Sequence, residues 1–268
     1  MIRTTPHRRP HQQGLSYLEM AIVIVIAGLI AGTVMVARDL KQTAKLEALT
    51  ADLVGYEAAI NQFHKQYNAL PGDIKNATYL WGKAGGNGDD AACQDTLASG
   101  RPTCNGNGDG IIATSVTPLD ESFRAWQHLH DATLVAGEFT GSITGIPFAK
   151  RLGRAFPTTK DRTIGYQLIT EDKTSEGWAH APEGTALIPA IRIAAPINED
   201  AALTGNVLSP ASAYLIDQKI DDAKPGTGKI YAVLTGSDHC TDSNETTSAN
   251  YLAKNHQVGC FLQYSLLK

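Results

Sequence analysis

The sequence predicts an α+β protein in which a long N-terminal helix precedes a head that contains an antiparallel sheet. Three observations lead to this prediction. Residues 20–37 form an apolar run, apolar residues at alternating steps of three and four follow it, and four strand-like segments lie in the second half of the chain. The 268 residues suffice for one large domain or two small ones.

The apolar run is long enough to cross a bilayer. Residues 20–37 are 18 uncharged residues, and together with residues 15–18 they reach the ~20 residues that a transmembrane helix needs. Glu19 lies near the start of this run, and a charge near the bilayer core costs at least ~2.5–3.5 kcal/mol. An ordinary secretory signal has a shorter apolar core followed by a small-residue cleavage site, so this segment fits an ordinary signal poorly.

The charge is unevenly distributed along the chain. The net charge is −4, but residues 1–14 hold three arginines and no acid, which leaves the remainder at −7. The basic flank is expected to stay cytoplasmic and to send the remainder outward. The acidic remainder argues against nucleic acid as the main partner.

Apolar periodicity continues beyond the membrane-length run. The residues concerned, called here the apolar stripe, are Leu46, Leu49, Leu53, Tyr56, Ile60, Phe63 and Tyr67. Their alternating steps predict one continuous helix over residues 16–68 with a core-facing side, and Pro71 with Gly72 should end it. A dimeric coiled coil is the general alternative for such a stripe.

The head is predicted to contain two helices and four strands. An Asp cap and apolar spacing predict a helix over residues 120–135, and Ser209 followed by Pro210 predicts a helix over residues 209–222. Strands are expected over residues 163–170, 185–194, 229–235 and 258–267. These elements fit an α+β head with an antiparallel sheet.

The chain contains four cysteines, whose pattern indicates whether the head lies in an oxidising environment. They are Cys93, Cys104, Cys240 and Cys260, and none lies in residues 1–14 or in the apolar run. They form no Cys-x-x-Cys motif, so a zinc site is not expected. The even number favours two disulfides in an oxidising space. Three pairings are possible and the local one, Cys93–Cys104 with Cys240–Cys260, is favoured; four reduced, buried thiols are the alternative.

The segment Gly14-Leu15-Ser16-Tyr17-Leu18-Glu19, between a short basic leader and the apolar run, resembles the prepilin cleavage and methylation motif. Type IV pilins and the pseudopilins of type II secretion share this motif. The resemblance implies that prepilin peptidase cleaves between Gly14 and Leu15 and methylates the new amino group of Leu15. The family usually has Phe at this first mature position.

The resemblance also implies an organisation of the chain. It consists of a leader over residues 1–14, a transmembrane segment over 15–37, a continuation of the helix over 38–70 and a periplasmic or extracellular head over 71–268. The implied fold is pilin-like, with the second half of the helix packed under the sheet of the same subunit. Residues 240–260 resemble the disulfide-bounded C-terminal region of type IV pilins.

The implied function is structural and not enzymatic. The chain would be a subunit of a type IV pilus or a type II secretion pseudopilus. Its implied partners are prepilin peptidase, other pilin or pseudopilin subunits, an inner-membrane assembly platform and membrane lipid. It would reside in the inner membrane as a single-pass protein and then in a surface pilus or a periplasmic pseudopilus. The competing hypothesis is a signal-anchored periplasmic enzyme or ligand-binding domain.

Three residues are expected to carry assembly. Cleavage would create an α-amino group four residues before Glu19, so the amine of one subunit can neutralise the Glu19 carboxylate of a neighbour. Gly28 and Gly32 form a Gly-x-x-x-Gly pair, which lets helices approach closely. The alternative for Glu19 is an interfacial acid at the edge of an ordinary signal anchor.

A calcium site is a further hypothesis for the head. Residues 105–110 place oxygen-bearing side chains at alternating positions and resemble the first half of a calcium loop. An EF-hand is excluded because position twelve would be Val116, where Glu is needed. A different calcium site would use Asn105, Asn107 and Asp109, completed by Asp89, Asp90 or Asp120. A polar turn held by Cys93–Cys104 is the favoured alternative, and no other cofactor is expected.

The remaining polar residues show no catalytic motif. The sequence lacks a His-Glu-x-x-His zinc motif, a Gly-x-Ser-x-Gly nucleophile motif and a phosphate-binding loop. His128 and His130 are two residues apart, so they point to different faces of a helix. Asp217, Asp221 and Asp222 form either a carboxylate cluster or a solvated helix surface, and the solvated surface is favoured.

Overall fold

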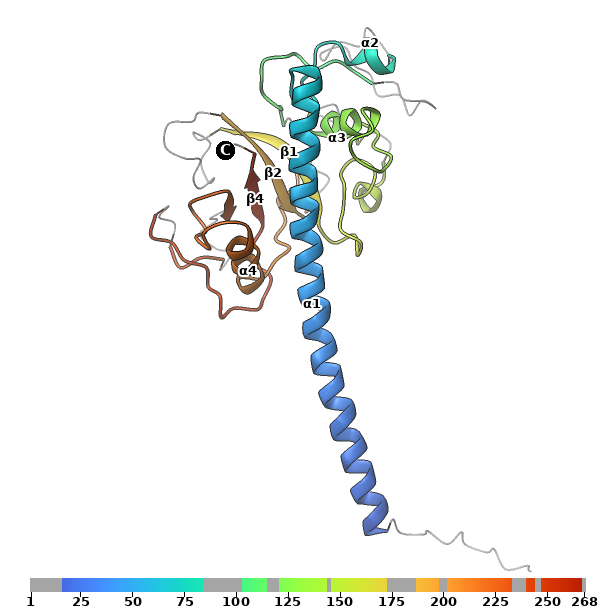
Figure 1. Cartoon of the computed structure of the whole chain (residues 1–268), viewed down its shortest axis with the longest axis vertical. Coiled ribbons are helices and arrows are strands. Elements are labelled where there is room, and N and C mark those ends of the chain that lie inside the picture. The colour runs from blue at the N-terminus through green and yellow to red at the C-terminus, as the bar shows by residue number, and fades with distance from the viewer. Residues whose placement is uncertain are drawn as a thin grey trace, which may run out of the picture. The chain divides into compact units, whose positions relative to one another are not determined.

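A computed structural model describes residues 16–83, 103–114, 121–143, 146–172, 187–197, 202–232, 240–243 and 247–266. The chain divides into two compact units, Met1–Lys45 and Leu46–Lys268, which are described in turn. The helix α1, Tyr17–Tyr67, contributes to both units (Figure 1). The predicted continuous helix is therefore confirmed to within one residue at each end.

The C-terminal end of α1 has an identifiable cause. Asn68 adopts a φ of 51°, and its N–H donates to the His64 carbonyl at 2.8 Å. Asn tolerates this left-handed conformation at the residue after a helix. Pro71 follows shortly afterwards and cannot continue a helix.

The first unit consists of the N-terminal half of α1, whose large apolar side chains are exposed. Ile24 and Leu29 are 67% and 65% exposed. The hydroxyl of Thr33 donates to the Ile30 carbonyl at 2.9 Å, so this polar group is satisfied within the helix. Within the described residues, α1 is the one helix that is long and apolar enough to be a candidate membrane span.

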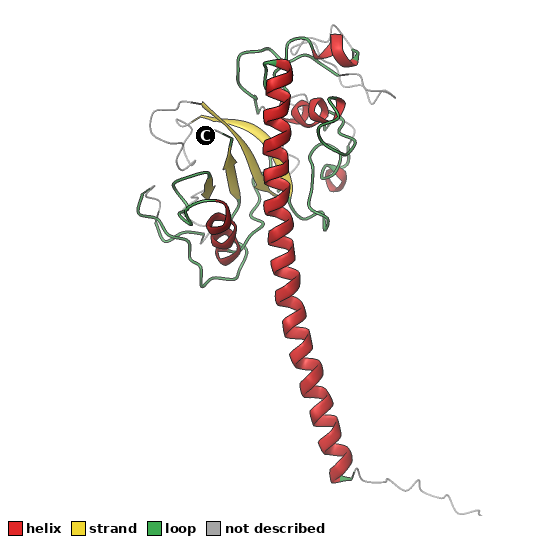
Figure 2. Ribbon diagram, in the orientation of Figure 1, coloured by secondary structure: helices red, strands yellow, loops and turns green. Residues whose placement is uncertain are grey.

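The second unit contains a four-stranded antiparallel sheet (Figure 2). Its strands are β1 (Gly165–Asp172), β2 (Leu187–Ala194), β3 (Ile230–Ala232) and β4 (Leu262–Ser265). They lie in the order β1-β2-β4-β3, and every neighbouring pair is antiparallel. All four predicted strands are present, and the α+β class is confirmed.

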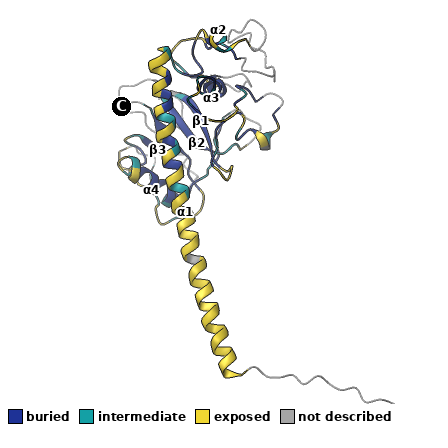
Figure 3. Cartoon of the chain, turned by 45° about the vertical axis from the view of Figure 1, so that its right-hand side comes forward, coloured by how far each residue is buried: buried dark blue, intermediate teal, exposed yellow. Residues whose placement is uncertain are grey.

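The second half of α1 packs on the head through the apolar stripe (Figure 3). Leu49, Leu53, Ile60 and Phe63 are buried, and the remaining three stripe residues are partly buried against the same core. Tyr56 places its ring 4.9 Å from Trp126 and 5.1 Å from Tyr166, centroid to centroid. The stripe is thus covered by the chain's own head, and the coiled-coil alternative is wrong.

Two carboxylates fix α1 against the sheet. Asp52 accepts a hydrogen bond from the Tyr166 hydroxyl of β1 at 2.9 Å. Glu57 forms an ion pair with Lys229, Nζ to Oε1 at 2.8 Å, and accepts from the Tyr264 hydroxyl of β4. These directional bonds to β1 and β4 specify one rotation and one axial position of the helix. Apolar packing alone would not specify either.

Three further α-helices and one 3₁₀ turn complete the described head. They are α2 (Ala77–Trp81), α3 (Glu121–Asp131), η2 (Phe148–Lys150) and α4 (Pro210–Ile220). The Ser209 hydroxyl accepts from the Ser212 N–H at 3.2 Å, and Pro210 occupies the first turn, so the predicted start of α4 is confirmed. The helix predicted to reach residue 135 ends at Asp131 because Thr133 adopts a φ of 61°.

Candidate assembly segment and polar sites of the head

The candidate assembly segment begins at the edge of the described residues. The predicted processing residues Gly14 and Leu15 lie outside them. Ser16 and Glu19, the next residues of the motif, lie at the start of α1. Their contacts define what the described part of this segment can do.

Glu19 closes a capping box with Ser16. The Ser16 N–H donates to Glu19 Oε2 at 2.9 Å, and the Leu18 N–H donates to Ser16 Oγ at 3.4 Å. This reciprocal arrangement satisfies N–H groups that a helix start leaves without intrahelical partners. The Ser-x-x-Glu spacing is a known signal for it, which the sequence analysis did not use. Glu19 therefore has a partner in its own chain.

The capping bond also sets where the charge lies. It draws the Glu19 carboxylate back toward Ser16, at the N-terminal end of the helix, where the helix dipole favours a negative group. The predicted cleavage would place a new amine one residue before Ser16. The capping bond thus holds the carboxylate at the end of the helix that would carry this amine.

Gly28 and Gly32 lie in open surroundings within α1. A Cβ built at either position meets no atom within 4 Å, and both backbones are helical. Glycine destabilises a helix interior by ~1 kcal/mol relative to Ala. The packing of the described chain therefore does not require either glycine, whereas close contact with another helix would.

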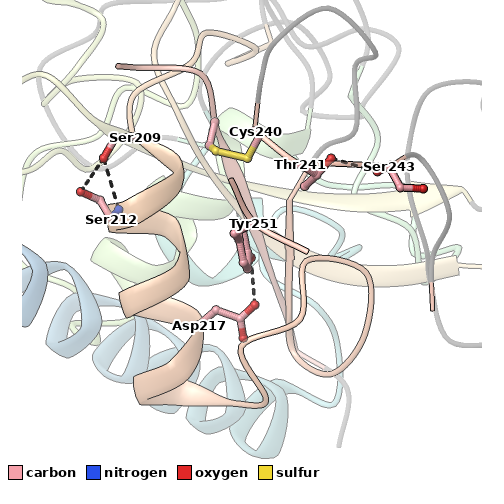
Figure 4. The surroundings of a disulfide bond; sticks show 8 residues. Ser209, Ser212, Asp217, Cys240, Thr241, Ser243 and Tyr251 are labelled. Atoms are coloured by element: carbon pink, nitrogen blue, oxygen red, sulfur yellow. Dashed lines mark hydrogen bonds between the residues drawn. A yellow bond between two sulfur atoms is a disulfide. The ribbon is translucent and has the colours of Figure 1, made fainter. Parts of the chain in front are cut away.

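A disulfide joins Cys240 and Cys260 (Figure 4). Their Cα atoms are 5.1 Å apart, and both side chains are buried. The local pairing predicted for these two cysteines is confirmed. Cys104 is also disulfide-bonded, and Cys93, its predicted partner, lies outside the described residues.

Asp73 organises the loop over residues 105–110. Its carboxylate is buried and accepts the N–H groups of Gly108, Asp109 and Gly110, the last two at 3.1 and 2.9 Å. Burial raises the pKa of Asp73, and these three N–H donors oppose the shift. Gly106 is required here because a Cβ would lie 2.3 Å from the Asp73 Cα atom.

The predicted calcium ligands do not all point to one centre. The amide oxygen of Asn105 accepts the Thr78 N–H, and that of Asn107 accepts the Asp109 N–H, each at 2.9 Å. Carboxylate oxygens of Asp73, Asp109 and Glu121 instead lie within 4.8 Å of one another. Sequence reasoning missed Asp73 and Glu121, which are distant in the chain.

Hydrogen bonds account for these acids without a metal. Glu121 is buried, and its two carboxylate oxygens accept the N–H groups of Asn107 at 3.1 Å and Ala113 at 3.0 Å. A polar turn held by buried carboxylates thus explains the loop. Asp89, Asp90 and Asp120, the residues expected to complete a calcium shell, lie outside the described residues, and the calcium site stays a prediction.

His128 is a neutral, fully buried imidazole. Its Nδ1 accepts the Gly72 N–H at 2.9 Å, and its Nε2 lies 3.2 Å from the Cys104 carbonyl oxygen. An accepting Nδ1 places the proton on Nε2. Burial lowers the pKa of His128 to about 3, with the positive charge of Arg124 acting in the same direction. The residue joins the turn at Gly72 to α3 and is structural.

The favoured interpretation of Asp217, Asp221 and Asp222 is wrong for the first of them. Asp217 is 0% exposed, and carboxylate oxygens of the three residues lie within 4.8 Å of one another. The Tyr251 hydroxyl covers Asp217 and donates to it at 2.8 Å. Helical spacing predicted the shared face correctly but could not show that a distant segment packs on it.

Comparisons with known proteins identify no relative. A scan of protein-family models, a search of curated proteins and a search of solved structures each found no match to this chain.

Proposed function

We propose that this chain is a structural subunit of a helical filament, either a type IV pilus or a type II secretion pseudopilus. One observation carries the proposal: Glu19 lies in the first turn of an exposed apolar helix that has no further charge until Arg38. A single carboxylate at the start of a membrane-length segment is expensive in lipid unless it has a function.

Assembly would supply a lone α1 with neighbouring helices around its apolar side chains and with a positive partner for Glu19. Neighbouring helices enclose the exposed apolar side chains in a protein bundle, where van der Waals packing between helices replaces contact with lipid. The methylated amine of Leu15 on one subunit meets the Glu19 carboxylate of the next, so both charges are neutralised. Because an unpaired charge is heavily penalised in an apolar bundle, the pair favours one stagger between subunits.

Processing precedes assembly in this proposal. Residues 1–14 stay cytoplasmic, prepilin peptidase removes them, and the head lies on the periplasmic side of the inner membrane. An assembly platform then moves the subunit from the membrane into the filament. The chain is a substrate of the peptidase and performs no catalysis.

Glu19 substitutions test this function. Glu19→Gln keeps an acceptor for the Ser16 N–H, since Glu and Gln both complete a capping box, but it removes the charge. Glu19→Ala removes both. The proposal predicts that both variants insert into the membrane and that neither assembles, measured as sheared filament or cross-linked multimer. Ser16→Ala, which keeps the Glu19 charge, is the matched control and should assemble.

The competing class gives the opposite result. A signal-anchored enzyme or ligand-binding domain uses Glu19 only as an interfacial or capping residue. In that case Glu19→Gln behaves like the wild type in every assay. Normal multimers from Glu19→Gln would contradict the filament proposal.

A further inference from the structure

A buried carboxylate joins three segments of the head. Asp217 of α4 is 0% exposed, its Oδ2 accepts the Tyr251 hydroxyl at 2.8 Å, and its Oδ1 accepts the Ala223 N–H at 3.1 Å. Figure 4 shows Tyr251 reaching α4 from the segment closed by the disulfide. The described residues 247–256, between Cys240 and Cys260, are called here the disulfide segment.

Two more carboxylates crowd Asp217. Those of Asp221 and Asp222 approach it to within 4.8 Å, and both are engaged with the connection between α4 and β3. Asp221 accepts the Lys229 N–H, and Asp222 accepts the Lys224 N–H at 2.9 Å. Three acids therefore converge at the base of α4.

The nearby cations are directed elsewhere. Lys224 Nζ lies 3.3 Å from the Asn250 amide oxygen, and Lys229 Nζ pairs with Glu57 at 2.8 Å. Asp242 accepts the Asn250 N–H at 2.7 Å, so this carboxylate is also bonded within the loop that the disulfide closes. Among the described residues, tyrosines also lie beside the cluster. Tyr231 donates to the Gly228 carbonyl, and the Tyr214 ring lies 6.3 Å from that of Tyr251.

Proton binding relieves this crowding. A neutral Asp217 keeps both accepting oxygens for Tyr251 and Ala223 and removes one of three close negative charges. Burial raises the pKa of Asp217 to about 7, the hydrogen bonds from Tyr251 and Ala223 oppose the shift, and Asp222 and Asp221 add to it. The residue can thus change its charge under mild conditions.

We propose that Asp217 is a proton-operated clasp: neutral, it holds the disulfide segment on α4, and ionised, it releases that segment. The backbone bonds that open are those from Leu252 N–H to the Cys240 carbonyl and from Ala211 N–H to the Asn255 carbonyl. The disulfide keeps both ends of the segment in place, so release changes its mobility without detaching it. This inference does not depend on filament assembly.

Hydrogen exchange on the full-length, detergent-solubilised protein tests the clasp. Backbone protection of peptides within residues 249–256 is measured at pH 5 and pH 8.5 and corrected for the intrinsic pH dependence of exchange. Because the pKa of Asp217 is raised only while the disulfide segment is closed, a rise in pH favours opening of the segment. Its protection should therefore be at least about tenfold lower at pH 8.5 than at pH 5. Peptides from residues 49–63 of α1 should change little. Equal protection of the disulfide segment at both values would overturn the proposal.

Two variants assign the effect to Asp217. In Asp217→Asn the amide oxygen accepts the Ala223 N–H and the amide N–H donates to the Tyr251 hydroxyl, so protection should be the same at both pH values. Glu138→Gln, an exposed carboxylate of the head, is the matched control and should keep the tenfold change. A tenfold change that persists in Asp217→Asn would refute the assignment.

Tyr251→Phe tests the clasp by hydrogen exchange in a variant that keeps the Asp217 carboxyl. It removes the hydroxyl that reaches Asp217 and leaves the ring against Tyr214. Protection of the disulfide segment at pH 5 should then fall toward the wild-type value at pH 8.5. Wild-type protection at pH 5 in this variant would also contradict the clasp.

Discussion

The two halves of α1 belong to one continuous helix but present opposite surfaces. In the first half, Leu29 and Ile30 are 65% and 58% exposed, and large apolar side chains project on every side. In the second half, Leu53 and Phe63 are fully buried, and charged residues such as Glu47 and Lys65 are exposed on the other faces. Both halves form the same secondary structure, so the difference lies in the side-chain pattern alone.

This contrast shows what each half needs from its surroundings. A helix that is apolar all round requires a lipid or protein environment on every side, whereas a striped helix requires one partner surface. The second half has its partner in the head of the same chain. Among the described residues of its own unit, the first half has none, which is why we propose that it lies in the membrane and then in a filament.

Truncation of a stripe residue should give the largest effect on stability. Phe63 is 0% exposed and its ring lies 4.6 Å from that of Tyr67, centroid to centroid. Phe63→Ala should lower the free energy of unfolding of the head by about 3–5 kcal/mol, because it leaves a cavity. Leu40→Ala, at a residue 65% exposed, should change it by less than about 0.5 kcal/mol.

Chemical denaturation followed by tryptophan fluorescence measures both values in detergent. Trp126 and Trp81 report on the head because they contact Tyr56 and Tyr67 of the second half. Equal losses in the two variants would break the comparison between the halves of α1.

The buried, neutral His128 near the end of α1 should make a contribution to the stability of the head that is lost in acid. Trp81 lies between Tyr67 and His128, with ring centroids 5.5 and 5.3 Å away. Burial lowers the pKa of His128 to about 3. Below about pH 6.5 the unfolded state therefore binds a proton at this residue, whereas the folded state stays neutral there. This contribution of His128 to stability is present above pH 6.5 and falls as the pH is lowered, by about 2 kcal/mol at pH 5.

Asp217, whose pKa is raised to about 7, acts on stability in the opposite direction over this range, so the contribution of His128 is read from the difference between the wild type and His128→Gln. Unfolding curves at pH 7.5 and pH 5 should show the stability of the wild type falling relative to that of His128→Gln by about 2 kcal/mol as the pH is lowered. His64→Gln, on an exposed face of α1, should retain the wild-type pH dependence of stability. A pH dependence unaffected by His128→Gln would show that another group controls it.

Two ion pairs that the second half forms with described residues should differ in strength. Lys229 and Glu57 lie 2.8 Å apart with side chains 31% and 15% exposed, whereas Lys219 and Glu47 lie 3.8 Å apart with side chains 52% and 64% exposed. Glu57→Gln should destabilise the head by about 1–2 kcal/mol because it weakens charge-assisted bonds to Lys229 and Tyr264. Glu47→Gln should cost less than about 0.5 kcal/mol. Equal effects in thermal unfolding would mean that Glu57 does not position α1.

Alanine at the two glycines of the first half should instead stabilise the lone chain. Replacing both Gly28 and Gly32 by Ala meets no atom within 4 Å and should stabilise the helix by ~1 kcal/mol at each position, visible by circular dichroism. Filament yield should nevertheless fall, because the added methyl groups separate neighbouring helices. Unchanged assembly would remove the close-contact role of these glycines.

Local patterns predicted most of the fold. The apolar stripe, the end of α1 before Pro71 and the cap at Ser209 each depend on residues a few positions apart, and the structure confirms them. The predicted ends of strands were less accurate, because pairing with a neighbouring strand determines where a strand ends. The strand predicted over residues 258–267 pairs as β4 only over Leu262–Ser265, since its register with β2 and β3 sets its length.

Polar sites were harder to predict because their members are far apart in sequence. Asp73 reaches the Gly110 N–H across 37 positions, and Asp217 meets Tyr251 across 34 positions. No local spacing encodes such contacts. The capping bond of Glu19 to Ser16 was different, because a separation of three residues made it readable from the sequence.

The N-terminal peptide of the membrane-bound or filament-bound protein provides the most direct measurement. The account predicts by mass spectrometry a chain that begins at Leu15 and carries one methyl group on its α-amine, with residues 1–14 absent. That terminus would create the amine proposed to neutralise Glu19. A membrane-bound protein that retains an intact Met1 terminus would contradict the account.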